Sequence, residues 1–379
     1  MSAKRFWGLD GLRGVCALTV VLLYASGLFW SGPIFQHGYL AMDMFFLLSG
    51  FVIAFAHEGQ LRTGLGLARF LKVRARRLLP VFWIGAVFNI AIFIAMASAG
   101  YYPGYGTAIV WLIVPLTTLL MLPAFGTPGN SFAPAMMSVT WSLAVEWLVN
   151  IAYAAFGFRL RTRTLATFAV AGWAAMAIAG YATGKGWCVG ITRDDFFSYG
   201  MMRGAPAFAA SVVLFRVHAR GWFTRLPVVA PQLLLTFWFC IAAMPTLTAT
   251  PTFDWIAVTL LCPLLILLLL RANDMAPPFC KSLGEVSYPL YVINPGIIFA
   301  GAENAFVRAG PWSRFAARAS GRRPLRWRGM DGERALPPAP AAPARRRLNN
   351  PALQKAPATP AQAVIKTGHA PHSSRHRKS

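Results

Sequence analysis

The feature that most constrains this chain is a series of long apolar runs that recur over most of its length. Apolar residues make up 56% of the sequence and charged residues 13%, which is roughly half the usual charged share of a globular protein. A helix crosses the hydrocarbon core of a bilayer with about 20 apolar residues, and it satisfies its own backbone hydrogen bonds there. The runs therefore exclude a soluble domain and a wholly disordered chain. They predict an all-α integral membrane protein.

We predict a polytopic bundle of about ten transmembrane helices. The first apolar run, Gly14 to Trp30, follows Lys4 and Arg5 as the core of a signal peptide would. However, it is long for a signal peptide, and Asp10 and Arg13 stand close before it, so we interpret it as a retained span. Further spans are predicted at about 39–56, 80–99, 108–123, 139–157, 165–183, 199–217, 231–247, 254–271 and 286–306.

The loop predicted at 57–79 indicates how the chain is oriented. It carries six Lys and Arg residues and one acid, Glu58, whereas the turn before it, 31–38, carries no Lys or Arg. Short basic loops face the cytoplasm, so we expect a bacterial inner-membrane protein with a cytoplasmic N-terminus. Farther along, strict alternation of ten spans places the Arg clusters at 159–163 and 216–225 outside. Both clusters lie inside if 108–123 is re-entrant, and the sequence leaves this choice open.

The positive charge is concentrated at the C-terminus. The chain has a net charge of +24, of which residues 308–379 carry +14 and residues 1–307 carry +10. The C-terminal part is rich in Pro, Ala and Arg and has few large aliphatic residues, so it is predicted to be a disordered tail after a membrane domain at 1–307. Its composition equally fits a terminus translated in a shifted reading frame. No folded basic domain is present, so nucleic-acid binding is not predicted. The five Cys residues are scattered without a C-x-x-C motif and predict no metal site.

Four ionisable residues at the start of or inside the predicted spans are candidates for a functional site. They are Arg13, Asp43, Glu146 and Arg203. A charged side chain inside a bilayer is costly and typically marks a substrate path or a proton relay. Each residue also has a structural interpretation, as an interfacial anchor or as a member of a buried ion pair.

Arg13 and Tyr24 are expected on one face of the first span. They are eleven positions apart, which is three helical turns plus roughly 20°. Arg13 would stand at the cytoplasmic mouth and Tyr24 nearer the middle of the membrane. The alternative is an arginine that snorkels to the interface and a packed aromatic ring.

The cluster of Arg74, Arg76 and Arg77 would suit a polyanion. Arginine makes forked hydrogen bonds to phosphate groups, although positive residues are also ordinary on the cytoplasmic side of a membrane. Asp43 could pair with a cation or position a polar substrate. Alternatively, backbone N–H groups at a helix start would satisfy its carboxylate.

Ser142 and Glu146 are four residues apart in an apolar segment and so share one helix face. A lone Glu in such a helix could exchange protons near neutrality. It could equally pair with a cation on a neighbouring helix.

Five motifs occur in order along the chain. They are LDGLRG at Leu9–Gly14, FFLLSGF at Phe45–Phe51, RRLLP at Arg76–Pro80, WSLAVE at Trp141–Glu146 and LGEVSYPLYVINP at Leu283–Pro295. With these motifs, the chain resembles the type-3 acyltransferase family of bacterial membrane proteins from about Phe6 to Ala300. Members of this family O-acylate cell-surface and secreted glycans.

The resemblance implies a reaction and a set of site residues. It implies a helical bundle that takes acyl-CoA, usually acetyl-CoA, as a cytoplasmic co-substrate and acylates a hydroxyl of a glycan or glycolipid. No tightly bound cofactor is implied, and the oligomeric state is not predicted. The resulting candidates are Arg13, Arg74, Arg76 and Arg77 for the donor phosphates, Glu146 and Asp43 for proton transfer or acceptor positioning, and Ser142, Arg203 and Asn294 for the substrate.

Two positions differ from the family pattern. Tyr24 and Asn294 stand where the family typically has His. Histidine is suited to act as a general base near pH 7, whereas a tyrosine with a pKa near 10 stays a neutral donor. His37 or Glu146 is then the expected base, and Tyr24 contributes at most a hydrogen bond. The rival hypotheses are a non-catalytic or degraded member of the family and a glycan or lipid permease.

Overall fold

A computed structural model describes residues 5–29, 34–98, 109–122, 137–183, 199–244 and 251–308. Every regular element within these ranges is helical, and five helices are long and apolar enough to cross a membrane. The prediction of an all-α polytopic membrane protein is therefore confirmed. The described residues all lie within one compact unit of the chain, 1–331. Apart from Arg308, the predicted tail lies outside the described residues.

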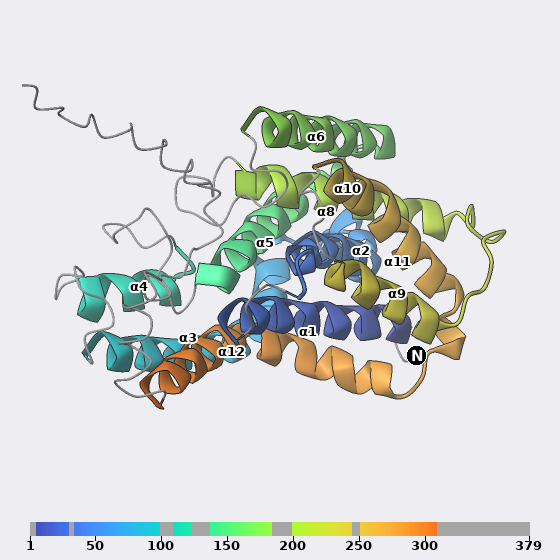
Figure 1. The fold of residues 1–379 in the computed structure, drawn as a ribbon. Coiled ribbons are helices and arrows are strands. Elements are labelled where there is room, and N and C mark those ends of the chain that lie inside the picture. The colour runs from blue at the N-terminus through green and yellow to red at the C-terminus, as the bar shows by residue number, and fades with distance from the viewer. Residues whose placement is uncertain are drawn as a thin grey trace, which may run out of the picture. The chain divides into compact units, whose positions relative to one another are not determined.

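Figure 1 shows the helices coloured in chain order. Their bounds are α1 Trp7–Phe29, η1 Gly38–Leu40, α2 Ala41–Arg62, α3 Leu67–Ser98, η2 Ile109–Ile113, α4 Val114–Leu119, α5 Met137–Ala155, η3 Gly157–Arg159, α6 Thr162–Thr183, α8 Met201–Ala219, α9 Pro231–Ala243, α10 Pro251–Ile256, η5 Ala257–Leu261, α11 Cys262–Arg271, η6 Asn273–Met275 and α12 Phe279–Arg308.

One predicted boundary is wrong. The loop expected at 57–79 is mostly helical, because α2 continues to Arg62 and α3 already begins at Leu67. The described part of the span expected at 108–123 contains η2 and α4, which together have 11 residues and rise roughly 16 Å.

The first and last helices pack closely along their length. Figure 1 shows α1 in blue beside α12 in orange, and the two helices form an extensive contact. Glycines of the LDGLRG motif make this approach possible. A Cβ atom at Gly14 would lie 2.5 Å from the Cβ atom of Leu283, and one at Gly11 would lie 2.6 Å from Sγ of Cys280. Because glycine lacks a side chain, the residues at the start of α1 come directly against α12.

A buried network fixes where the later Arg clusters lie. Arg216 on α8 donates from Nε to Glu58 of α2 at 2.9 Å, and it donates to the carbonyl oxygens of Leu160 and Phe158 at 2.7 and 3.1 Å. The hydroxyl of Tyr153 donates to the other oxygen of Glu58 at 2.8 Å. Both clusters, 159–163 and 216–225, therefore lie at the end of the bundle that carries the basic residues between α2 and α3.

The N-terminus and the connection after α11 belong to the same end. The ring of Phe6 contacts the rings of Phe55 and His218. The side chain of Asn273 donates to the carbonyl oxygen of Arg5 at 3.4 Å. We call this end of the bundle, with Arg5, Arg62 and the clusters at 159–163 and 216–225, the basic end. Of the two arrangements left open by the sequence, the structure has the one in which both Arg clusters share a side with the first basic segment.

Side chains bridge the backbone of α12 where prolines interrupt it. Pro295 has no N–H to donate, and the side chain of Asn294 donates instead to the freed carbonyl of Tyr291 at 2.9 Å. Asn89 of α3 donates to the carbonyl of Val292 at 2.9 Å and accepts from the N–H of Gly296 at 2.6 Å. The amide of Asn89 thus replaces one step of the α12 hydrogen-bond ladder and joins α3 to α12.

Candidate active site

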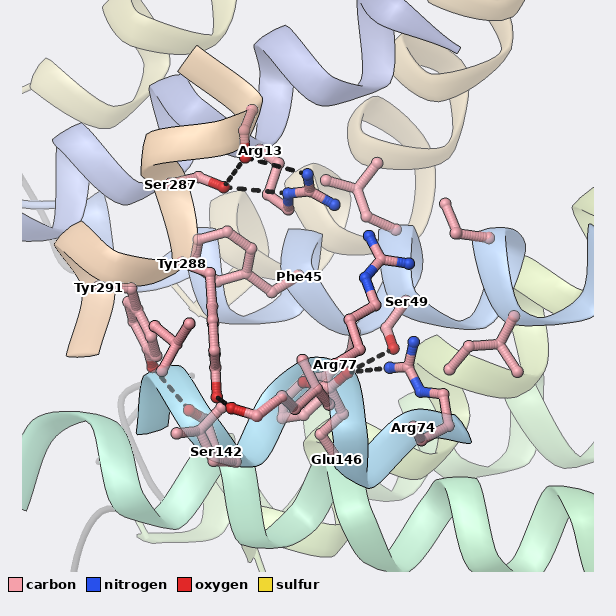
Figure 2. A pocket seen from close by; sticks show the side chains of 18 of the residues that line it. Arg13, Phe45, Ser49, Arg74, Arg77, Ser142, Glu146, Ser287, Tyr288 and Tyr291 are labelled. Carbon is pink, nitrogen blue, oxygen red and sulfur yellow. Dashed lines mark hydrogen bonds and ion pairs between the residues drawn. The ribbon is translucent and has the colours of Figure 1, made fainter. Parts of the chain in front are cut away.

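A cavity of about 330 Å³ lies among α1, α2, α3, α5 and α12. Its walls include residues from all five motifs: Arg13 from the first, Ser49 from the second, Arg77 from the third, Glu146 from the fourth and Tyr288 from the fifth. Figure 2 shows these side chains around one space. Motifs that are far apart in the sequence therefore build one site.

Arg13 is anchored at the edge of this cavity by α12. Its Nε donates to Oγ of Ser287 at 3.0 Å, and its Nη2 donates to the carbonyl of Gly284 at 3.1 Å. Asp10, one turn earlier on α1, accepts from the same Nη2 at 2.9 Å. The close packing of α1 and α12 brings these groups together. Arg13 is consequently held by the protein on one side, and its side chain is 28% exposed on the other.

Glu146 is the carboxylate of the site. Its Oε1 accepts a hydrogen bond from Oγ of Ser49 at 2.8 Å and another from Nη2 of Arg74 at 3.2 Å. Its Oε2 accepts no hydrogen bond from the described part of the chain. The side chain of Glu146 is 21% exposed, whereas that of Arg74 is 8% exposed. One oxygen of the carboxylate is therefore fixed, and the other is available to a ligand.

Two guanidinium groups of α3 retain unused donors. Nε of Arg74 is buried and has no hydrogen-bond partner among the described residues. Arg77 lines the cavity and forms no hydrogen bond or ion pair with any residue that the structure describes. An unpaired buried donor is costly, so Arg74 suits an anionic ligand. Arg77 is exposed, and its donors are open to the same ligand.

The other side of the cavity carries hydroxyl groups. Oγ of Ser142 and the hydroxyl of Tyr291 are 2.6 Å apart, and the Tyr291 hydroxyl also donates to Sδ of Met42 at 3.0 Å. Figure 2 shows this pair on the opposite side of Glu146 from Arg74. Apolar side chains that include Phe45 and Leu143 line the wall as well. We call the Ser142–Tyr291 side the hydroxyl end of the cavity.

Asp43 and Arg203 were predicted as site residues, and the structure pairs them with each other outside the cavity lining. Nη2 of Arg203 donates to Oδ2 of Asp43 at 2.6 Å and to the carbonyl of Tyr39 at 3.2 Å. The guanidinium also lies 5.4 Å from the ring centre of Trp141. The side chains of Asp43 and Arg203 are 0% and 1% exposed.

His37 joins a neighbouring polar group rather than the cavity. Its Nδ1 lies 3.1 Å from Oδ1 of Asp254, and the hydroxyl of Tyr39 donates to Oδ2 of Asp254 at 2.6 Å. The ring of Phe253 covers the imidazole at 4.6 Å between ring centres. No local pattern connects His37 with Asp254, which is 217 positions away.

The three remaining predicted residues also lie outside the cavity lining. Tyr24 is partly buried, packs against the core and interacts electrostatically with Tyr291. Arg76 is exposed on α3. Asn294 is buried and bonded to its own helix, although its Oδ1 has no partner among the described residues.

Sequence reasoning missed several groups that line the cavity. Ser49 was interpreted only as a small residue that permits close helix packing, and its partner Glu146 is 97 positions away. Ser287, Tyr288 and Tyr291 all lie in the last motif. Tyr291 comes four positions after Ser287 and three after Tyr288, and residues three or four apart are neighbours on a helix surface. This spacing was the signal that could have found them.

Comparison with known proteins places the chain in a family. A family model described as an acyltransferase domain matches residues 6–317. Protein 2 in the picA locus of Rhizobium radiobacter is 38% identical over 168 residues, which cover 41% of this chain and 84% of that protein. The exopolysaccharide production protein ExoZ of Rhizobium meliloti is 28% identical over 124 residues, which cover 33% of this chain and 36% of ExoZ. The match thus spans only about a third of ExoZ. No solved structure matches the chain.

The family match covers most of the sequence and every wall of the cavity, so the chain belongs to the type-3 acyltransferase family, as its five motifs predicted.

Proposed function

We propose that this membrane acyltransferase moves a short acyl group, acetyl in the first instance, from acyl-CoA to a hydroxyl of an exported polysaccharide. The observation that carries the proposal is the cavity itself. It combines arginine donors without partners, a carboxylate with one unclaimed oxygen, and a pair of hydroxyl groups opposite. Phosphate binding, proton transfer and recognition of a sugar hydroxyl each need one of these groups.

The arginine side of the cavity suits the donor. CoA carries several phosphate groups, and arginine binds phosphate through charge-assisted, forked hydrogen bonds. Arg13, Arg74 and Arg77 supply unused guanidinium donors, and Arg5 lines the cavity beside them. A permease for neutral glycans has no use for such a cluster.

The volume of the cavity favours a short acyl group. Sites for small molecules range from about 300 to 1,000 Å³, and this cavity of about 330 Å³ is at the lower limit. The thiol-bearing arm of CoA and a two-carbon acyl group suit such a volume, whereas a long acyl chain does not.

The acceptor class rests on the relatives. ExoZ is named for exopolysaccharide production, and a polysaccharide offers many hydroxyl groups of the kind that an acyltransferase modifies. Ser142 and Tyr291 can exchange hydrogen bonds with a sugar at the hydroxyl end. Glu146 would take the proton of the attacking hydroxyl, because a general base must lie within hydrogen-bond reach of that proton.

The basic end of the bundle gives the proposed orientation. Arg5, Arg62 and the clusters at 159–163 and 216–225 gather there, and Lys and Arg accumulate on the cytoplasmic side of bacterial inner-membrane proteins. We therefore place the N-terminus and the donor entrance in the cytoplasm. A Cys introduced at Arg69 should resist a membrane-impermeant thiol reagent in intact cells, and ready labelling would reject this orientation.

The proposed reaction is tested with purified protein in lipid nanodiscs, acetyl-CoA and bacterial exopolysaccharide. Release of free CoA thiol and the appearance of O-acetyl groups on the polysaccharide should rise together. Both should fall in Glu146→Gln, and neither should change in Arg69→Gln, which alters an exposed residue of α3. Polysaccharide binding without CoA release would favour a permease or a non-catalytic member and would overturn the proposal.

A further inference from the structure

Ser49, Arg74 and Glu146 have the arrangement of an activated nucleophile. The Ser49 hydroxyl points its proton at Oε1 of Glu146 over 2.8 Å, and Arg74 holds the same oxygen at 3.2 Å. A nucleophile within hydrogen-bond reach of a base, with the base oriented by a third group, is the recurring geometry of covalent catalysis. Figure 2 shows Ser49 and Arg74 pointing at Glu146 from two different helices.

The backbone of α2 holds Ser49 in this orientation. Gly50, the next residue, packs against α8 so closely that a Cβ atom there would lie 2.6 Å from the carbonyl oxygen of Phe208. The α8 side of α2 is thus fixed by backbone contact, and Ser49 lines the cavity. A rotation of α2 that removed Ser49 from Glu146 would have to break this contact.

A comparison with Glu58 separates this geometry from an ordinary structural carboxylate. Both oxygens of Glu58 accept hydrogen bonds, from Arg62, Arg216 and Tyr153. Glu58 lies outside the cavity lining. Glu146 instead keeps Oε2 open toward the cavity, and a serine hydroxyl that can react is its neighbour.

We propose that Ser49 carries the acyl group between donor and acceptor as a transient acyl ester, an inference that rests on the function proposed above. Oγ of Ser49 forms a bond to the thioester carbonyl carbon, and the carbon–sulfur bond breaks. The Ser49 proton passes to Glu146 and then to the departing thiolate, so CoA leaves as a free thiol. A hydroxyl of the acceptor then attacks the acyl carbon and displaces Oγ. Its proton passes to Glu146 and returns to Ser49.

The size of the cavity favours two steps. At about 330 Å³ it is at the lower limit for a small-molecule site, so donor and acceptor are expected to occupy it in turn. With the acyl group stored on Ser49, CoA can leave through the arginine side before the acceptor enters at the hydroxyl end. Glu146 can serve both half-reactions. It contacts Ser49, and it is one helical turn from Ser142 of the hydroxyl end on α5.

The test is to mix purified protein with acetyl-CoA in the absence of polysaccharide. A carrier should release a burst of CoA equal in amount to the protein, as covalent catalysis does. The intact protein should gain the mass of one acetyl group, peptide mapping should locate the group on Ser49, and later addition of polysaccharide should remove it. Ser49→Ala should lose both burst and label. Ser282→Ala, at an exposed position of α12, should keep both.

Ser49→Cys is a second variant, which keeps the test decisive if Ser49→Ala does not fold. It should again accept one acetyl group, now as a thioester that neutral hydroxylamine cleaves faster than the serine ester. The proposal is overturned if wild-type protein releases CoA only when polysaccharide is present and carries no acetyl group, because the transfer is then direct. It is also overturned if the label is on another residue. In both results the proposed acyltransferase function survives. If no CoA is released under any condition, both the proposed function and the role of Ser49 as acyl carrier are rejected.

Discussion

Two groups of polar and charged residues occur in the helical bundle, and they differ in what surrounds them. The first, which we call the cavity cluster, consists of Ser49, Arg74, Arg77 and Glu146. Its carboxylate is 21% exposed, and Arg77 has no bonded partner in the described part of the chain.

The second group, the sealed cluster, consists of Asp43, Arg203, His37 and Asp254. Their side chains are 0%, 1%, 7% and 6% exposed, and each is paired. Tyr39 links the two pairs, because its carbonyl accepts from Arg203 and its hydroxyl donates to Asp254.

The difference teaches that a charge inside the membrane is not by itself a sign of chemistry. Asp43 and Glu146 look alike in the sequence, since each is a lone acid in an apolar segment. A buried charge without its partner is severely destabilising, so the sealed cluster is expected to act on folding. The cavity cluster has donors and an acceptor left over, so it is expected to act on a ligand.

Glu146→Gln should produce the largest effect on turnover. Removing a positioned general base typically lowers the rate about 10²–10⁴-fold, and the amide is nearly isosteric with the carboxylate. The rate of CoA release with polysaccharide should fall by that factor. The melting temperature in detergent should fall less than in Arg203→Met, because the amide oxygen can still accept from Arg74. A rate within a few-fold of wild type would show that Glu146 is not the general base. The cavity cluster would then have no more chemical role than the sealed cluster.

Arg203→Met should have the opposite pattern. It leaves Asp43 as an unpaired charge in a site that is 0% exposed, and breaking such a pair costs about 3–5 kcal/mol of stability. Thermal unfolding in detergent should show the loss, and the folded fraction should retain donor binding. The double variant Arg203→Met/Asp43→Asn should recover part of the stability. Equal stability of the single variant and wild type would contradict a structural role for the sealed cluster.

Tyr24→His tests whether a base at the family position adds to the one in the cavity. The new imidazole would lie near Tyr291, at the hydroxyl end, and a general base contributes at least about 10²-fold. Transfer should therefore rise by about that factor at pH 8. The gain should disappear as the pH falls below about 6.5, because the protonated imidazole cannot accept a proton. Tyr24→Phe, which removes only the hydroxyl, should show no gain. A gain in Tyr24→Phe would point to a packing effect instead.

Arg77→Gln should have the smallest of the four effects, and it should be confined to the donor. A hydrogen bond to a charged group contributes about 1.5–3 kcal/mol, so acetyl-CoA affinity should fall about tenfold or more by calorimetry. Polysaccharide affinity should not change. Arg76→Gln is the matched comparison, since Arg76 is exposed next to Arg77 but does not line the cavity. Its effect should be smaller and should disappear in high salt. Equal losses would mean that the whole basic segment attracts CoA without a specific contact.

Much of the fold could be predicted from the sequence because its signals are local. Apolar runs of membrane length and a basic segment after the second run require no knowledge of the tertiary structure. The end of the helix within the predicted span 108–123 could not be predicted, because apolar composition does not determine where a helix ends. The described helix there ends at Leu119, and residue 121 already has a positive φ of 56°.

The candidate site was predicted less completely. Arg13, Arg74, Arg77, Ser142 and Glu146 carry charge or stand at helical spacing within motifs, and all of them line the cavity. The contact between Ser49 and Glu146 joins two helices across 97 positions. No local pattern encodes such a pairing, and none told Asp43 apart from Glu146.

The network around Glu58 has a consequence for how the protein is made. Arg62 is four positions from Glu58 and can pair with it as soon as α2 has been synthesised. Arg216, the second guanidinium of the same carboxylate, is 158 positions later. At about 5–20 residues per second, the ribosome takes roughly 8–30 s to deliver it. During that interval Glu58 is paired with Arg62 and, once α5 has been made, with the hydroxyl of Tyr153. The carbonyl groups of Phe158 and Leu160 still lack the guanidinium that will donate to them. The nascent chain therefore passes through a stage in which its first helices are inserted and its central bundle is still open, and the arrival of α8 closes it.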